Sequence, residues 1–195
     1  MSGAALTRAV HELFNHPALR RTLVRLRVPL FIALGIALLW FADRDWFLPA
    51  LGTSLFGEAI QLWCFASLQK NQVLAANGPY ALVRNPMYLG RYFLLLGMLM
   101  LLGNGWLLLA FTVVYYFYMV NRVRREEALL TPTFGEAYVR YCAAVPRFVP
   151  RLTPHAGGRI AFFDRDTFLR NHGLRNLAQV AAFYALAGYF AFLAH

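Results

Sequence analysis

The placement of basic residues between the apolar runs constrains this chain most. Of its 19 Lys and Arg residues, only Arg44 falls on the opposite side of the apolar runs from the others. Basic residues gather on the cytoplasmic side of membrane proteins. Fifty-nine per cent of the residues are hydrophobic, which excludes a disordered chain and an ordinary soluble domain. We predict an all-α, multi-pass integral membrane protein whose net charge of +10 reflects topology rather than nucleic-acid binding.

The apolar runs predict about five transmembrane helices in a single membrane domain. The predicted spans cover residues 28–42, 46–68, 87–102, 106–120 and 174–194. The chain then divides into a cytoplasmic interfacial segment (1–27), a core (28–150), a basic linker (151–173) and a last transmembrane helix (174–195). We place the N-terminus in the cytoplasm and the C-terminus outside, in the inner membrane of a bacterium. The basic first segment argues against a cleaved signal peptide.

A polar stretch, residues 77–91, interrupts the apolar pattern just before the third span. Asn85 followed by Pro86 predicts an N-cap and a first helical residue, so that Arg84 lies just outside the helix and Tyr88 in its first turn. Free backbone N–H groups and a guanidinium would then converge, which favours binding of a carboxylate or phosphate. The structural alternative is a capped membrane helix with an interfacial Arg and Tyr.

Glycines flank this helix start. Gly78-Pro79 predicts a turn that returns the chain to the same point. Gly90 leaves space where a backbone or a ligand can approach, and Gly97 lies on the same face seven residues later. The pair serves close helix packing as readily as ligand approach.

Glu58 and Gln61 lie three residues apart inside the second span and therefore share a helix face. An ionisable residue at membrane depth usually points at a partner or a cavity. The sequence leaves two readings open: a functional role, or pairing with a neighbouring helix for assembly.

Adjacent Glu126 and Glu127 follow the fourth span among several Arg residues, where ion pairing four residues apart on a solvated helix is the simplest reading. Thr133 and Glu136 fit a capping box, which predicts a short cytoplasmic helix over residues 134–144. The tyrosines and phenylalanine at 115–118 indicate an interfacial belt or, secondarily, the wall of a ligand site. The Cys and His residues show no metal-ligand spacing, and we predict no metal.

Several of these pieces occur together in an order that resembles the isoprenylcysteine carboxyl methyltransferase family, which is in turn similar to the phospholipid N-methyltransferases. The matching pieces are Gly78-Pro79-Tyr80, Arg84-Asn85-Pro86-x-Tyr88-x-Gly90, Glu126-Glu127-x-x-Leu130, Phe134-Gly135-x-x-Tyr138-x-x-Tyr141 and Pro146-Arg147. The resemblance covers about residues 57–150, and the first and fifth spans agree only in being apolar.

The resemblance implies an S-adenosylmethionine-dependent methyltransferase, with residues 28–150 as the methyltransferase-like core and a cofactor pocket at the cytosolic face. The cofactor-binding residues that it implies are Tyr80, Arg84, Asn85, Pro86, Tyr88, Gly90, Glu126, Glu127, Tyr138 and Arg147. Glu58, Gln61 and Tyr88 are the candidate catalytic residues, on the path of a lipid-like or amphiphilic acceptor that enters laterally from the membrane lipids. The methylated group is a carboxylate, an amine or a thiol.

Two departures and two alternatives accompany this resemblance. Asn85 replaces the His of eukaryotic members, and Gln61 replaces an Arg found in many relatives, which argues against a farnesylated cysteine as acceptor. Membrane sterol and steroid reductases, which use a nicotinamide cofactor such as NADPH, share a similar motif but typically place an acidic residue where this chain has Arg91. A non-catalytic membrane scaffold is the other alternative.

Overall fold

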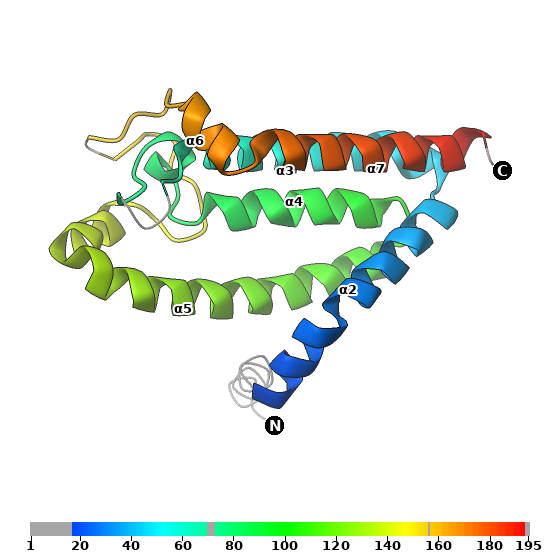
Figure 1. The fold of residues 1–195 in the computed structure, drawn as a ribbon, viewed down its shortest axis with the longest axis horizontal. Coiled ribbons are helices and arrows are strands. Elements are labelled where there is room, and N and C mark those ends of the chain that lie inside the picture. The colour runs from blue at the N-terminus through cyan, green and yellow to red at the C-terminus, as the bar shows by residue number, and fades with distance from the viewer. Residues whose placement is uncertain (1–16, 70–72, 156, 194–195) are drawn as a thin grey trace.

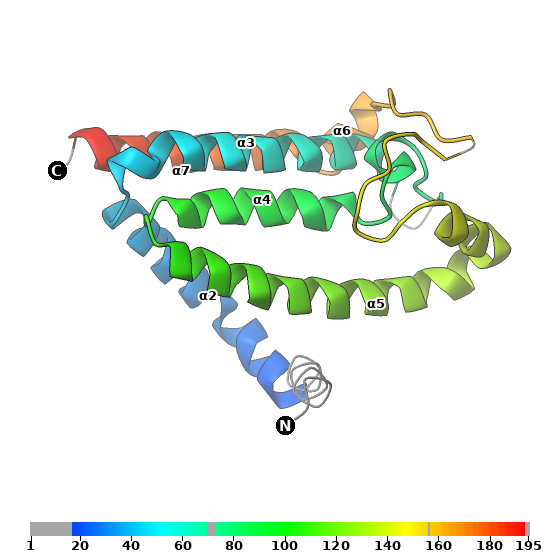
Figure 2. The same ribbon diagram turned by 180° about the vertical axis from the view of Figure 1, so that it is seen from behind.

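The computed structural model describes residues 17–69, 73–155 and 157–193. In these ranges the chain forms helices and no strands: α2 (Pro17–Trp40), α3 (Arg44–Ser67), η1 (Gly78–Ala81), α4 (Pro86–Met100), α5 (Gly105–Ala144), α6 (Arg165–Arg170) and α7 (Gly173–Leu193). Helices α3, α4, α5 and α7 run along the long axis, and α2 crosses away diagonally (Figure 1). Seen from both sides, α4 lies between α5 and the layer of α3 and α7 (Figure 2). The all-α prediction is therefore confirmed for the described residues.

Polar caps set several of the helix boundaries. The carboxylate of Asp43 accepts a hydrogen bond from Asp45 N at 2.8 Å, and α3 begins at the next residue, Arg44. Asn104 caps α5 by accepting from Leu107 N at 3.1 Å. A side-chain oxygen at the N-cap satisfies a backbone N–H that the helix itself leaves unpaired. Short polar turns between apolar runs are thus enough to separate these helices.

Small residues bring α3 and α4 into close contact. A Cβ on Gly57 would overlap the α4 backbone, and a Cβ on Gly90 would lie 2.8 Å from Gly57 O. At Gly97 an added Cβ would collide with Ser54, whose hydroxyl donates to Leu94 O at 2.9 Å. Gly90 and Gly97 therefore serve backbone-to-backbone helix packing, one of the two roles that their spacing predicts.

Two helices, α5 and α7, are long and apolar enough to cross a membrane by length and composition. The apolar helical stretches Val28–Trp40 and Pro86–Met100 are shorter. Many large apolar side chains are exposed on the outer surfaces of the bundle, among them Leu30, Leu48 and Trp106. This combination is consistent with a membrane protein, since lipid rather than water would cover such surfaces.

Helix α5 consists of two helices that meet at a kink, in line with the prediction of two elements, although the first of them runs past residue 120. It continues from the fourth apolar run through the polar segment to Ala144, with a kink at Gly135, whose φ of 52° and ψ of −134° are not helical. A positive φ costs least at glycine. The predicted capping box is wrong, because the Thr133 hydroxyl donates back to Leu129 O at 2.8 Å within the preceding turn. The bend nevertheless redirects the chain near the predicted helix start.

The interfacial segment predicted for residues 1–27 lies partly outside the described residues. From Pro17 onward the chain is helical without interruption to Trp40, so no boundary separates residues 17–27 from the first apolar run. Proline at position 29 is accommodated inside this helix.

Candidate functional site

A strap, residues 146–155 and 157–159, runs alongside η1 and the segment that joins η1 to α4. Backbone hydrogen bonds join the two segments at several points, because irregular backbone must find partners wherever it is shielded from water. The bonds are Gly78 N to Arg159 O (2.8 Å), Arg151 N to Leu82 O (3.0 Å), His155 N to Ala81 O (3.2 Å) and Arg84 N to Pro146 O (2.9 Å). The stretch predicted as a basic linker therefore includes a structural support for the motif, placed at one end of the bundle.

Arg84, Glu127 and Arg147 form one ion-pair network. Arg84 Nη1 lies 3.1 Å from Glu127 Oε1, and Arg147 Nη2 donates to Glu127 Oε2 at 2.5 Å. Glu127 is 12% and Arg84 15% exposed at the side chain, so their attraction is screened less than at an open surface. Arg84 Nη1 also donates to Cys142 Sγ at 3.0 Å. The first arginine of the motif is thus fixed from two directions by α5 and the strap.

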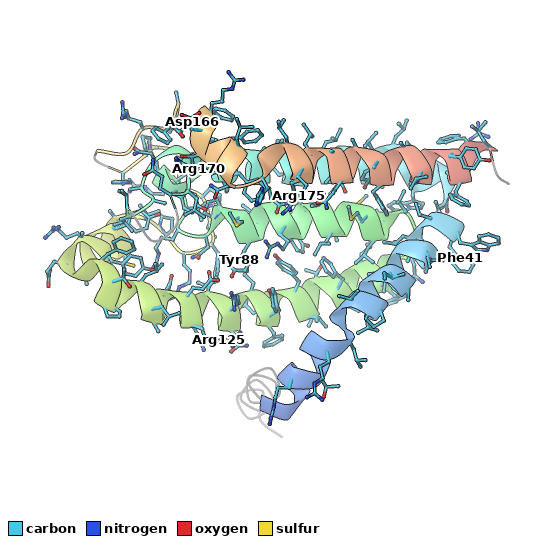
Figure 3. All side chains as sticks on the ribbon, in the orientation of Figure 1. Phe41, Tyr88, Arg125, Asp166, Arg170 and Arg175 are labelled. Atoms are coloured by element: carbon cyan, nitrogen blue, oxygen red, sulfur yellow. The ribbon has the colours of Figure 1, made fainter. Side chains whose placement is uncertain are left out.

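Tyr88, Glu126 and Arg122 form a second network one turn away. Tyr88 donates its hydroxyl proton to Glu126 Oε1 at 2.8 Å, and Arg122 Nε donates to Tyr88 Oη at 3.2 Å and to Glu126 Oε1 at 3.0 Å. Figure 3 shows Tyr88 between α4 and α5. The i,i+4 pairing expected for adjacent glutamates is present between Arg122 and Glu126, and Glu127 reaches across to other segments instead.

A cavity of about 760 Å³ opens beside both networks. It is lined by residues from α3, α4, α5 and the α6–α7 connection, and by the segment before η1. The lining includes Tyr80, Arg84, Asn85, Met87, Tyr88, Arg91, Tyr118, Arg122, Glu126, Leu130, Phe134, Tyr138, Tyr141, Arg170 and His172. Its volume matches the range of ligand and cofactor sites.

Three tyrosines form an aromatic wall of this cavity. Tyr141 donates its hydroxyl to Tyr80 O at 2.8 Å, and the rings of Tyr138 and Tyr141 lie 6.2 Å apart. Burial is the main cause that raises the pKa of Tyr80 well above its ordinary value, and burial also raises the pKa of Tyr138 and of Tyr141. These hydroxyls therefore stay protonated at neutral pH and act as donors rather than bases.

The start of α4 lies at Pro86, as the sequence predicts, but the role of Asn85 differs. Asn85 is the N-cap residue and its side chain makes no capping hydrogen bond; Nδ2 donates instead to Arg147 O at 3.2 Å. The predicted side-chain cap is wrong, because the strap competes for this amide. At the first helical positions Pro86 has no N–H and Tyr88 N donates to Asn85 O at 3.2 Å, so at most the Met87 N–H is left for an anion.

The ten predicted cofactor residues separate into three groups. Six of the ten predicted cofactor residues line the cavity: Tyr80, Arg84, Asn85, Tyr88, Glu126 and Tyr138. Glu127 and Arg147 stand behind Arg84 as its partners. The structure places Gly90 against Gly57 and Gln61 of α3, away from the cavity lining, and buries Pro86 at the first helical position.

Glu58 and Gln61 are both buried between helices and do not line this cavity. Both carboxylate oxygens of Glu58 accept from Asn176 Nδ2, at 2.8 and 2.7 Å. Helix pairing, one of the two readings that the sequence leaves open, is the one this geometry favours, with an α7 amide as the partner. Gln61 Nε2 is buried with no hydrogen-bond partner among the described residues.

A family model and several curated relatives all relate this chain to membrane methyltransferases. A family model described as phospholipid methyltransferase matches residues 51–137. The chain is 40% identical over 81 residues to the protein-S-isoprenylcysteine O-methyltransferase of Schizosaccharomyces pombe, covering 42% of this chain and 34% of the relative. It is 33% identical over 82 residues to the B form of that enzyme from Arabidopsis thaliana, covering 42% of each chain. Over residues 51–137 the chain is therefore similar to the phospholipid methyltransferases, and over 81 and 82 residues to isoprenylcysteine methyltransferases.

A bacterial relative extends over more of the chain. The cobalt-zinc-cadmium resistance protein CzcN of Cupriavidus metallidurans is 31% identical over 140 residues, covering 66% of this chain and 62% of the relative. The chain thus spans between about a third and two thirds of the length of these three curated relatives. No solved structure matches the chain.

Three arginines line the cavity and were not among the predicted site residues: Arg91, Arg122 and Arg170. Arg91 follows the glycine of the family motif directly, and its guanidinium carbon lies 5.9 Å from the centroid of the Tyr88 ring. Helix periodicity could have indicated Arg122, since it precedes Glu126 by one turn. Arg170 lies at the end of α6 (Figure 3) and reaches the cavity only through the tertiary fold.

Proposed function

We propose that the protein is an S-adenosylmethionine-dependent methyltransferase that acts on a membrane-embedded or amphiphilic acceptor. The observation that carries the proposal is the cavity beside Arg84, where the motif before α4 and the paired glutamates of α5 come together. The methyltransferase relatives and the phospholipid methyltransferase model, which covers residues 51–137, support it.

The residues present fit the cofactor. Arg84 Nε is buried and has no hydrogen-bond partner in the described part of the chain, so a donor beside the cavity lacks an acceptor. Buried donors are rarely left unpaired without a reason. Arg84 and the Met87 N–H at the start of α4 would hold the cofactor's carboxylate. The aromatic wall of Tyr80, Tyr138 and Tyr141 suits a flat base.

The remaining residues hold these groups in place. When bound, the cofactor supplies a methyl group on a positively charged sulfur, which is already reactive toward a nucleophile. The protein therefore has mainly to orient the acceptor and exclude water. Arg147 and Glu127 keep Arg84 in position, and Arg122 and Glu126 keep the Tyr88 hydroxyl in position.

The topology belongs to the same proposal. We propose five spans, with the N-terminus and the cavity on the cytoplasmic side of a bacterial inner membrane and the C-terminus outside. Arg84, Arg122 and Arg170 all lie at the cavity end, which suits the cytoplasmic side. The acceptor would enter laterally from the lipid. Gln61, whose buried amide lacks a partner, is proposed to lie on the path of the acceptor's tail.

Two measurements test the proposal. Isothermal titration in detergent should show binding of S-adenosylmethionine and none of NADPH, which distinguishes a methyltransferase from a membrane reductase. Incubation with labelled cofactor and a lipid extract of the host should then give a labelled, lipid-soluble product. Binding of NADPH alone would favour the reductase, and binding of neither cofactor would favour a non-catalytic scaffold.

A further inference from the structure

Arg91 is a cavity-lining cation without a carboxylate partner. The other motif arginine, Arg84, is paired with Glu127, and Arg122 is paired with Glu126. For Arg91 the described residues provide a contact with the face of the Tyr88 ring, 5.9 Å from its centroid, and no ion pair. Its charge therefore remains uncompensated where it faces the cavity.

The depth of Arg91 makes this unpaired charge informative. Arg91 is partly buried and lies five residues after Pro86, about 7.5 Å along α4, which we treat as a membrane span. An Arg inside a span is costly and commonly marks the binding site of a substrate or ion. The anionic end of the cofactor is already assigned to Arg84 at the helix start. A second anion, deeper in the bundle, would satisfy Arg91.

The charge balance of the cavity favours an anion over an ammonium group. Four arginines line it, namely Arg84, Arg91, Arg122 and Arg170, against a single lining carboxylate, Glu126. Glu126 accepts hydrogen bonds from both Tyr88 and Arg122, and is therefore already engaged. A positively charged headgroup would meet net repulsion in this cavity.

Apolar side chains complete the wall around these charges. Met87 from α4, Phe65 and Leu68 from α3, and Leu129 and Leu130 from α5 contribute to the lining. A small hydrophilic anion would leave this surface without a matching ligand group, whereas an alkyl chain would cover it and gain from leaving water.

We propose that Arg91 binds an anionic group, a carboxylate or a phosphate, on the amphiphilic acceptor, and so determines which acceptors enter the cavity. This inference rests on the proposed methyltransferase function, whose acceptor it narrows to an anionic amphiphile. Arg91 is placed to act on the acceptor alone, since Arg84 and its partners serve the cofactor end.

The test measures binding of long-chain probes to the purified protein in a non-ionic detergent. Hexadecanoate, hexadecyl phosphate and uncharged hexadecanamide share a chain length and differ in headgroup. We expect both anions to bind at least tenfold more tightly than the amide. Arg91→Gln should weaken both anions at least fivefold and leave the amide unchanged, and Arg91→Lys should restore part of the loss. Arg124→Gln is the matched control, because Arg124 is an exposed arginine on α5 outside the cavity lining.

The outcomes distinguish a long-chain anion from a small hydrophilic one. They also separate the proposed role of Arg91 from the proposed methyltransferase function. If acetate or inorganic phosphate, which carry no alkyl chain, displaced the long-chain anionic probes, the proposal that the ligand is amphiphilic would be overturned. Equal affinity for acid and amide, or equal losses in Arg91→Gln and Arg124→Gln, would overturn the role of Arg91. Cofactor affinity and thermal unfolding of each variant, measured in parallel, should be unchanged. A protein that binds the anionic probes through Arg91 but does not bind S-adenosylmethionine would refute the methyltransferase proposal and leave the anion site intact.

Discussion

The bundle contains two polar clusters that differ in what surrounds them. Between α3 and α7, Glu58 is 1% exposed and both of its carboxylate oxygens are occupied by Asn176. At the cavity, the side chains of Arg122 and Glu126 are 42% and 38% exposed, and they meet Tyr88 at an open wall. The first cluster is closed to any ligand and the second is not. A buried carboxylate in a membrane helix is therefore a sign of function only where its partners leave room for another molecule.

The largest effect is expected when the closed cluster is broken. Asn176→Leu would leave the Glu58 carboxylate buried without its donor, which costs about 3 kcal/mol or more of unfolding free energy. Titration with a denaturing detergent, followed by circular dichroism, measures the loss. The double variant Glu58→Leu/Asn176→Leu should recover most of it, because no charge is then left unpaired. A single variant as stable as the wild type would contradict the assignment of this pair to assembly.

Breaking the ion pair of Arg84 and Glu127, which lies next to the open cluster, should change cofactor binding. Arg84→Ala or Glu127→Ala is expected to weaken S-adenosylmethionine binding by about 1.5–3 kcal/mol, the cost of a lost charge-assisted hydrogen bond. Isothermal titration measures the change. Arg159→Ala is the control, since Arg159 is exposed and contributes its backbone groups to the strap. Equal affinities in the three variants would place the pocket elsewhere.

Gly90 is a predicted cofactor residue that packs against α3 instead of lining the cavity. Its missing side chain makes room for Gly57 O and Gln61, so Gly90→Ala should destabilise the bundle by about 1–3 kcal/mol through overpacking. Cofactor affinity should not change, which thermal unfolding and titration together can establish. Gly52→Ala is the control, because an added Cβ there meets nothing within 4 Å. A selective loss of cofactor affinity would instead return Gly90 to the site.

The smallest effect is expected at the hydroxyl that joins α4 to α5. Tyr88→Phe removes the hydroxyl that donates to Glu126 and accepts from Arg122. The activation free energy of methyl transfer should rise by about 1 kcal/mol. Cofactor affinity is expected to remain unchanged. Single-turnover rates with labelled cofactor measure this change. A rate that falls tenfold further than this prediction would mean that the hydroxyl itself contacts the reacting groups.

The sequence was most informative where a local rule and a motif coincide. Pro86 begins α4 as its missing N–H predicts, and the turn at Gly78 is present with a φ of 61°. It was misleading where a side chain had a choice of partners. Asn85 could cap its own helix, yet its amide reaches the carbonyl of Arg147, a residue far along the chain. Thr133 similarly prefers a carbonyl of its own helix to the predicted cap.

By itself, the sequence determined the all-α architecture, the apolar helices and the resemblance to membrane methyltransferases. These features depend on local periodicity, on hydrophobicity and on short motifs, which do not require distant parts of the chain. The tertiary structure decided which charges are paired. Only the packing of α5 and the strap against the motif joins Glu127 to Arg84 and Arg147, and only the contact of α3 with α7 gives Glu58 its amide partner. The role of a polar side chain depends on which groups already form hydrogen bonds or ion pairs with it. Partners that are distant in the sequence cannot be identified from a local sequence pattern.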